Sequence, residues 1–261
     1  MNYKCLSIAG FDGSGGAGLQ ADLKTFSALG CYGMTVLTAL PVQNTMGVQS
    51  CYDIPLEAIS AQLHALLDDI VPDSIKIGML FKKDIVELVA DILSERAQGI
   101  PIVLDPVMVA KSGDDLLLPD AINALKSRLL PMATLITPNL PEAQALAGPS
   151  NDMQQLADTL LGLGAKAILL KGGHQEGNDS NDLLVTPEGS AWFNSPRIQS
   201  KNTHGTGCTL SAAIAAYLAR GCSLNNACEL AKLYLTEALI AAKHCSVGHG
   251  HGPVHHFYNL W

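Results

Sequence analysis

Short aliphatic runs alternate with helical patterns along the whole chain, and this alternation limits the fold more than any other feature. Runs such as 4–9, 74–77 and 101–104 are short and continuously apolar, which indicates buried strands. Apolar residues at helical spacing lie between them, for example at 55–70 and 84–97. Because strands that alternate with helices form right-handed βαβ units, we predict an α/β fold with a mostly parallel sheet.

The remaining elements continue this rhythm to the end of the chain. We expect further strands at 34–40, 134–136 and 167–170, a β-hairpin at 183–185 and 191–193, and helices at about 17–29, 119–130, from 141, 152–163, 207–220 and 224–244. Composition breaks, repeats and linkers are absent from the sequence, so we predict one domain over residues 1–261. Ligands of such folds bind beyond the carboxyl ends of the strands, which is where the glycine and polar clusters fall.

Charge and cysteine usage limit the partners and the location. The chain has 16 basic and 24 acidic residues, a net charge of −8, which argues against binding to nucleic acid or an anionic membrane. Its apolar stretches are too short for a membrane span, and the N-terminus lacks the pattern of a signal peptide. The 7 cysteines are odd in number and contain no CxxC pair, as in reduced proteins. We therefore expect a cytoplasmic protein.

A glycine-rich segment follows the first predicted strand and precedes the first predicted helix. Residues 13–18 match the G-x-G-x-x-G pattern of dinucleotide-binding folds. That interpretation requires an acidic residue at the end of the second strand, and the first one after that strand is Asp53. A phosphate-binding P-loop is excluded, since Gly-Lys-Ser/Thr follows none of the glycines. A tight turn that allows close approach of backbones remains as the simple alternative.

A second glycine pattern, His204-Gly-Thr-Gly-Cys208, opens a helix rich in small residues. Free N–H groups and the dipole at a helix start favour an anion there. Cys208 lies in the first turn, where these groups should lower the pKa of its thiol. The alternative is a glycine N-cap beside a small buried cysteine.

Cations and carboxylates follow other predicted strands at the same edge. Asp105 ends one strand and suits Mg²⁺ or its water shell, and Lys111 follows in the next loop. Asn139 and Glu142 follow another strand, where Glu142 either caps a helix or joins the metal site. Lys171 ends a third strand. Together with the glycine-rich helix start, these groups are of the kinds that enzymes use for phosphoryl transfer.

At this point the chain resembles a known family, the hydroxymethylpyrimidine/phosphomethylpyrimidine kinases of thiamine biosynthesis, in the ribokinase-like superfamily. The most specific marker is Gly-Thr-Gly-Cys208, because sugar kinases of the superfamily carry Asp at that position. The matching segments run nearly end to end: GGAGLQADLKTF at 15–26, VQNT at 42–45, KIGML at 76–80, LDPVM at 104–108, AKSG at 110–113, TPNLPE at 137–142, LKGGH at 170–174, NTHGTGCTLSA at 202–212 and GHGHGPV at 248–254.

The resemblance implies a single-domain, three-layer α/β/α fold with a small β extension, and a homodimer. It implies ATP- and Mg²⁺-dependent phosphorylation of 4-amino-5-hydroxymethyl-2-methylpyrimidine and then of its monophosphate. Substrate would be bound by Gly10, Asp22, Gln43, Met79 and Val107. ATP would be bound by Asp105, Lys111, Asn139, Glu142, Lys171 and Thr206, with Asp105 and Glu142 also serving the metal. Catalysis would rest on Cys208 as base and on Gly205, Thr206 and Gly207 as anion hole.

One departure bears on the substrate. The family reads Ala-Gly-Ser/Thr-Asp-Pro after the first strand, whereas this chain has Phe11 and Gly13 in that segment. An aromatic ring at position 11 would narrow or reshape the pocket. Two alternatives therefore stay open: a kinase for pyridoxal, pyridoxine or pyridoxamine, and a noncatalytic ligand-binding domain on a kinase scaffold.

Overall fold

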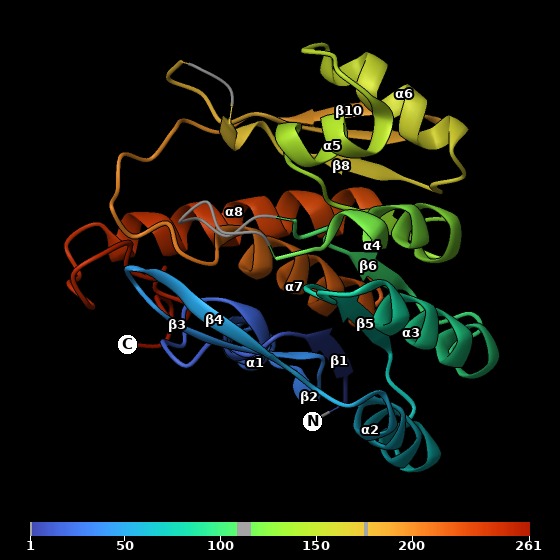
Figure 1. Ribbon diagram of the computed structural model, residues 1–261. Helices are drawn as coiled ribbons and strands as arrows, with labels where there is room; N and C mark the ends of the chain where they lie inside the picture. The colour runs from blue at the N-terminus through green and yellow to red at the C-terminus, as the bar shows by residue number, and fades with distance from the viewer. Residues whose placement is uncertain (1, 109–115, 175–176) are drawn as a thin grey trace.

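An eight-stranded sheet forms the centre of the molecule (Figure 1). The computed structural model describes residues 2–108, 116–174 and 177–261. The strand order is β10-β9-β8-β7-β6-β5-β1-β2, and only β9 and β10 run antiparallel to their neighbours. The mostly parallel sheet predicted from the alternation is thus confirmed. Its strands are β1 Lys4–Ala9, β2 Tyr32–Leu37, β5 Ser74–Ile77, β6 Ile102–Leu104, β7 Leu135–Ile136, β8 Ile168–Leu170, β9 Asp182–Thr186 and β10 Gly189–Phe193.

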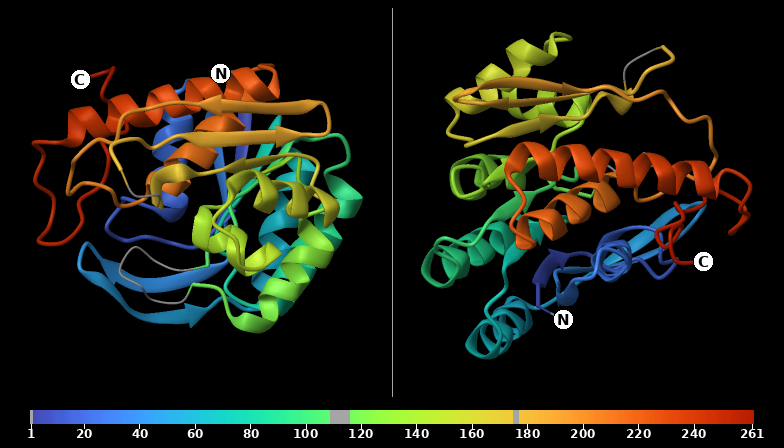
Figure 2. Two further views of the ribbon diagram at one scale, coloured as in Figure 1. Left: turned by 90° about the horizontal axis from the view of Figure 1, so that it is seen from above. Right: turned by 180° about the vertical axis from the view of Figure 1, so that it is seen from behind.

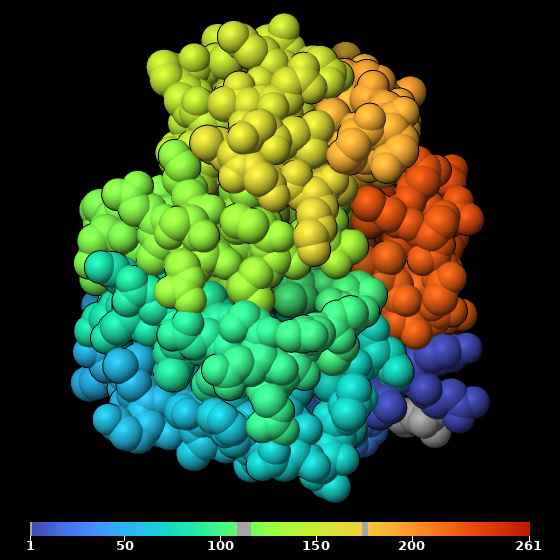
Figure 3. Space-filling view, turned by 90° about the vertical axis from the view of Figure 1, so that its right-hand side faces the viewer, coloured from blue at the N-terminus to red at the C-terminus, as the bar shows by residue number. Residues whose placement is uncertain are grey.

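Helices cover both faces of the sheet, which gives three layers (Figure 2). One face carries α1 Gly18–Ala28, α7 Thr206–Ala219 and α8 Leu224–Ala242. The other carries α2 Leu56–Asp69, α3 Lys83–Arg96, α4 Pro119–Ala124, α5 Leu140–Ala147 and α6 Met153–Gly162. These five follow one another along the sheet, as the colours from cyan to yellow show in Figure 3. No helix within the described ranges is both long and apolar enough to span a membrane.

The strands are buried on both sides, and the period of two along each strand decides which core a side chain joins. Leu6 and Ile8 of β1 pack in the core under α2–α6, as do Ile75 and Ile77 of β5. The residues between them point to the opposite face. Lys76 is one of these, so a lysine is placed beneath α1 and α7.

A second, two-stranded sheet extends from the carboxyl edge of the large one (Figure 1). It is the hairpin of β3, Ala39–Asn44, and β4, Gly47–Asp53. The predicted strand at 34–40 was wrong at its end, because the chain leaves the large sheet at Thr38, whose hydroxyl donates to the Met79 carbonyl at 2.6 Å. The two-residue turn at 45–46 lacks the Asn-Gly or Asp-Gly signal of such hairpins.

The other predicted elements are confirmed within a few residues, with one change of helix type. The pattern at 119–130 predicts one helix, but α4 ends at Ala124 and a π-helical turn, Leu125–Leu129, follows. The hairpin expected at 183–193 is formed by β9 and β10. The small β extension implied by the family resemblance is the β3–β4 hairpin.

Candidate active site

A cavity of ≈ 670 Å³ lies at the carboxyl edge of the large sheet, around the start of α7. Its hairpin side is lined by residues from the ends of β1, β5 and β6 and from the β3–β4 hairpin. Its α8 side is lined by α8 and by the segments 195–198 and 203–206. The cavity therefore lies where parallel α/β sheets bind their ligands.

Four of the five predicted substrate residues meet at the hairpin side. Gly10, Gln43, Met79 and Val107 all line the cavity. The side-chain amide of Gln43 donates to the carbonyl of Phe11 at 3.2 Å, and Phe11 lines the same wall. A Cβ at Gly10 would lie 2.9 Å from the Met79 sulfur, so only glycine leaves Met79 in this position. These side chains form a wall of mixed polar and apolar character.

Asp22, the fifth predicted substrate residue, lies elsewhere. Its side chain is fully buried behind the cavity wall. Its carboxylate accepts hydrogen bonds from Ser7 and from Lys76, whose Nζ lies 2.8 Å from Oδ2. In the ligand-free protein the Asp22 carboxylate thus pairs with Lys76 and does not line the cavity, and its contact with the substrate stays a prediction. A single sequence offers no signal for this pair, since 54 residues separate its members.

The carboxylate of Asp12 organises the glycine loop, residues 13–18. It accepts hydrogen bonds from the backbone N–H of Ser14, Gly16 and Ala17 and from Nε2 of His204, at 2.7 to 3.1 Å. Burial raises the pKa of Asp12, but the hydrogen bonds from His204 and Ser14 outweigh it and hold the value at about 2. Sequence reasoning missed this residue, although Asp two positions before Ser is a local turn signal.

The glycine loop and the start of α7 touch backbone to backbone. Gly205 has φ 75°, and a Cβ there would lie 1.8 Å from the Gly16 carbonyl oxygen. A Cβ at Gly16 would lie 2.4 Å from the His204 ring. The simple interpretation of the glycine pattern, a turn that permits close approach, is confirmed.

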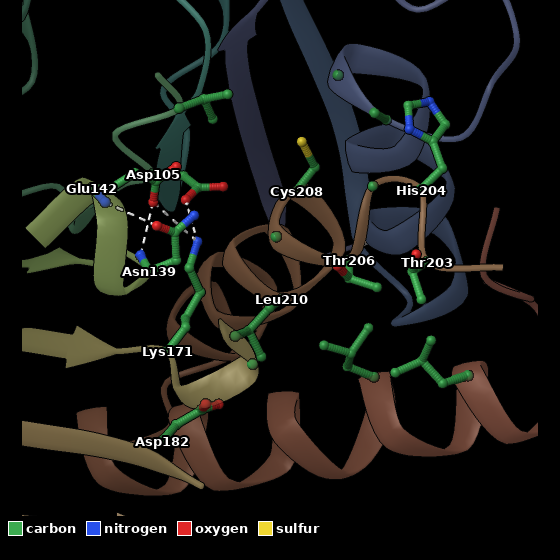
Figure 4. A pocket seen from close by; sticks show the side chains of 18 of the residues that line it. Asp105, Asn139, Glu142, Lys171, Asp182, Thr203, His204, Thr206, Cys208 and Leu210 are labelled. Atoms are coloured by element: carbon green, nitrogen blue, oxygen red, sulfur yellow. Dashed lines mark hydrogen bonds and ion pairs between the residues drawn. The ribbon is translucent and has the colours of Figure 1, made fainter. Parts of the chain in front are cut away.

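The start of α7 faces the cavity without a side-chain cap. Gly205 is the N-cap residue, and Gly205, Thr206 and Gly207 line the cavity. The first N–H groups of a helix have no partner within it, and the helix dipole adds positive potential there. Figure 4 shows the sulfur of Cys208 projecting from this first turn. The predicted anion-binding position and the predicted catalytic base are adjacent.

The thiol of Cys208 differs from the sequence expectation in its acidity. Burial raises its pKa to about 11, against the lowering effect of the Lys76 ammonium and of a hydrogen bond from the Gly18 N–H. The prediction of a lowered pKa was therefore wrong for the ligand-free protein. Removal from water disfavours the charged thiolate and so raises the pKa of the thiol. This effect is larger than the lowering by the helix start and by the nearby cation.

A cation–carboxylate cluster lies beside the start of α7 (Figure 4). Lys171 Nζ is 2.9 Å from Asp105 Oδ1 and 3.8 Å from Glu142 Oε2. Thr137 and Ser211 donate to the two oxygens of Asp105, each at 3.2 Å. Burial lowers the pKa of Lys171, but Asp105 and Glu142 outweigh it and keep the pKa above its usual range, so this lysine is charged. Residues that follow β6, β7 and β8 and residues of α5 and α7 thus form one charged cluster.

Asn139 and Glu142 cap α5 reciprocally. The Asn139 side chain accepts from the Glu142 N–H at 2.9 Å, and the Glu142 carboxylate accepts from the Asn139 N–H at 2.8 Å. Burial raises the pKa of Glu142 to about 7. The capping alternative is thus correct for the ligand-free protein, and Glu142 still lines the cavity.

Asp105 and Glu142 fit the sparse ligand set that Mg²⁺ requires. Among the residues described, no three His, Cys, Asp or Glu side chains gather in a way that could hold a metal ion. Mg²⁺ binds through one or two carboxylates, with phosphates and water completing its shell. Two carboxylates beside an anion-binding helix start match that requirement. Lys111, the other predicted cation, lies outside the described residues.

A second buried ion pair lines the α8 side of the cavity. Lys232 Nζ lies 2.8 Å from Asp182 Oδ2 and also donates to the Ser180 carbonyl. The other oxygen of Asp182 accepts from the Gly172 N–H at 2.9 Å. Sequence reasoning missed Lys232, because a single lysine on an amphipathic helix has the pattern of a solvated residue.

Known proteins resemble the chain over nearly its whole length. A kinase of Escherichia coli K12, named hydroxymethylpyrimidine/phosphomethylpyrimidine kinase, is 54% identical over 261 residues, which covers 98% of each chain. The crystal structure of phosphomethylpyrimidine kinase from Clostridium difficile is 42% identical, with a TM-score of 0.81 over 91% of this chain and 99% of that one.

Pyridoxal kinase of Staphylococcus aureus, solved with AMP-PCP and pyridoxal, has the same fold. It is 34% identical, with a TM-score of 0.90 over 100% of this chain and 96% of that one. The family model described as phosphomethylpyrimidine kinase matches residues 12–255. From this match and the site geometry it follows that the chain belongs to the phosphomethylpyrimidine kinase family.

Proposed function

We propose that this protein is an ATP-dependent kinase that phosphorylates 4-amino-5-hydroxymethyl-2-methylpyrimidine, and then its monophosphate to the diphosphate, in thiamine biosynthesis. The observation that carries the proposal is the position of Cys208. It lines the same cavity as the Lys171–Asp105–Glu142 cluster and as Gln43 and Met79, and Figure 4 shows it on the first turn of α7 with the cluster to one side. A phosphate donor on one side and an alcohol on the other would meet at the start of α7. The name of the E. coli relative supports this substrate.

The groups around the α7 start suit the phosphates of ATP. The N–H groups of Thr206, Gly207 and Cys208 would bind the transferring phosphoryl group, whose charge spreads over its equatorial oxygens. Lys171 would contact the triphosphate once ATP is bound. Asp105 and Glu142 would hold Mg²⁺ directly or through water, and the ion would supply further positive charge to the phosphates.

Cys208 would accept the proton of the substrate alcohol. As the alcohol oxygen bonds to the γ-phosphorus, the bond from that phosphorus to the ADP oxygen breaks, and the hydroxyl proton passes to the sulfur. A thiolate with a raised pKa is a strong base, although few molecules of the ligand-free protein carry one at neutral pH. The reaction should therefore become faster as the pH rises.

Pyridoxal is a second candidate substrate. The S. aureus relative was solved with pyridoxal and shares the fold at a TM-score of 0.90. Phe11 lines the hairpin side of the cavity, where an aromatic wall suits either heteroaromatic ring. Identity to the E. coli hydroxymethylpyrimidine kinase is higher, at 54% against 34%, which favours the pyrimidine.

Partners and location stay predictions. The net charge of −8 supports small-molecule partners rather than nucleic acid or an anionic membrane. We propose a homodimer in the cytoplasm. Leu40, Val42 and Tyr52 are exposed on the hairpin and offer one apolar surface for a second copy.

The direct test is a product analysis. The protein is incubated with ATP, Mg²⁺ and either the pyrimidine alcohol or pyridoxal, and the products are weighed by mass spectrometry. We expect the pyrimidine to gain one and then two phosphoryl groups. Phosphorylation of pyridoxal alone would support the second candidate. Binding without any product would instead indicate a noncatalytic ligand-binding domain.

The amide of Gln43 should recognise the ring of the substrate. Loss of paired buried hydrogen bonds costs ~1–3 kcal/mol, so Gln43→Ala should raise the substrate KM roughly ten- to a hundredfold and leave the KM for ATP unchanged. Gln49→Ala, at an exposed position of the same hairpin, is the matched control. A normal substrate KM in Gln43→Ala would place the ring elsewhere.

Lys171 should act on the nucleotide side. We expect Lys171→Met to lower kcat/KM by about a hundredfold or more, since its charge stabilises the transferring group, while substrate binding stays measurable. Lys166→Met removes an exposed lysine just before β8 and should have no such effect. Steady-state kinetics and calorimetric titration give the two quantities, and equal kcat/KM in both variants would contradict the role.

The role of Cys208 predicts a pH profile. A thiol with a raised pKa is protonated at neutral pH, so kcat/KM should keep rising above pH 8 toward the pKa of about 11. Cys208→Ala should lose at least about tenfold in kcat. Cys208→Asp should retain part of the activity without the rise, because a carboxylate is already ionised. The exposed Cys245→Ala is the control, and full activity in Cys208→Ala would leave Cys208 as packing.

A further inference from the structure

Lys76 is a fully buried lysine that the reaction outlined above does not use. Its side chain has 0% exposure, and so does that of Asp22, its partner. Burial of a charged pair removes both groups from water, which costs several kcal/mol per ion before their attraction is counted. Such a pair gives little net stability over apolar residues of the same size. Stability alone therefore does not account for the Lys76–Asp22 pair.

The strand period and the contacts of α7 place Lys76 beneath Cys208. Ser74 and Lys76 point to the same face of β5, and the Ser74 hydroxyl donates to the Ala215 carbonyl of α7 at 2.7 Å. Lys76 lies about 6.6 Å further toward the carboxyl end of the strand. Cys208 lies two turns before Ala215, about 10.5 Å along the same side of the helix. The Lys76 side chain, extended toward the carboxyl end of β5, covers most of the difference between these two distances.

The contacts of α1 lead to the same place. Gly18 and Asp22 are four residues apart and share one side of α1. The Gly18 N–H contacts the Cys208 sulfur, and Asp22 holds the Lys76 ammonium. A Cβ at residue 78 would lie 2.7 Å from Lys76 Nζ, so Gly78 leaves the room that the ammonium occupies.

One donor of Lys76 is left over. An ammonium has three N–H groups, and within the described residues the hydrogen bonds of Lys76 go to the two oxygens of Asp22, at 3.0 and 2.8 Å. Lys76 and Cys208 both line the cavity. We propose that the Lys76–Asp22 pair is a positioning device, in which the remaining N–H of Lys76 stabilises the Cys208 thiolate and orients its sulfur. This use rests on the function proposed above for Cys208.

The charges around Cys208 predict in which direction the pKa of its thiol moves when Lys76 is removed. Lys76 on β5 lowers the pKa of the thiol, whereas Asp22 on α1 and Asp105 after β6 raise it. Lys171 after β8 also interacts with Cys208. Lys76 has the largest effect of the charged groups. Its loss should therefore make the thiolate rarer at any given pH.

The proton balance is simple. The thiol of Cys208 releases its proton to solvent, and the thiolate then pairs with Lys76. During transfer the thiolate takes the proton of the substrate alcohol, so Cys208 ends as a thiol. Lys76 keeps all its protons throughout, and Asp22 holds it in place.

The test measures the thiolate without the kinase reaction. Iodoacetamide alkylates thiolates, and peptide mass spectrometry reads the rate at Cys208 alone as the pH is raised. Lys76→Met would leave Asp22 buried and unpaired, so the variants are D22N/K76M and D22N/K76Q, which neutralise both partners. The loss of Lys76 raises the thiol pKa by more than the loss of Asp22 lowers it, so we expect alkylation of Cys208 to be about threefold to tenfold slower at each pH.

The matched control is D182N/K232M, which neutralises the Lys–Asp pair on the α8 side of the cavity. It should leave the Cys208 rate as in wild type. A change of less than about threefold in the folded D22N variants would overturn the proposal, as would an equal change in the control. The alkylation shift stands whether or not a product forms, so failure of the proposed kinase reaction is seen separately in the product analysis.

Discussion

The rest of the site depends on the hydrogen bonds that the carboxylate of Asp12 accepts. It gathers the N–H groups of the glycine loop and the ring of His204, and so holds two segments that are 192 residues apart in sequence. The contact of Gly205 with Gly16 is possible only because Gly205 has no side chain. The first turns of α1 and α7 meet beside this junction, where the Gly18 N–H contacts the Cys208 sulfur.

Within the described residues, three lysines of low exposure line the cavity, and each pairs with an aspartate. Lys76 pairs with Asp22, Lys171 with Asp105, and Lys232 with Asp182. Pairing allows the fold to keep these cations out of bulk water. Away from water, a cation interacts more strongly with a bound anion. The protein can thus bind phosphates although its overall charge is −8. The local arrangement of charge decides ligand binding here, rather than the total.

Much of the fold was predictable because it depends on local periodicity. Aliphatic runs at 4–9 and 74–77 became buried strands, and the small-residue pattern after Gly207 became a helix between sheet and α8. The family resemblance implied a small β extension, but the pattern did not place the β3–β4 hairpin, since its turn carries no distinctive residues. The acidity of Cys208 was misjudged because the helix start is visible in sequence, whereas burial is not.

The sequence by itself determined the α/β class and the edge of the sheet at which the cavity lies. These follow from hydrophobic period and from the rule that parallel strands present their carboxyl ends together. Only the tertiary structure decided which charges pair. Asp22 turned away from the substrate wall to Lys76, and Glu142 became a cap as well as a cavity residue. Pairing depends on burial and on the distances between elements that are far apart in sequence. Neither quantity can be predicted from the local order of residues along the chain.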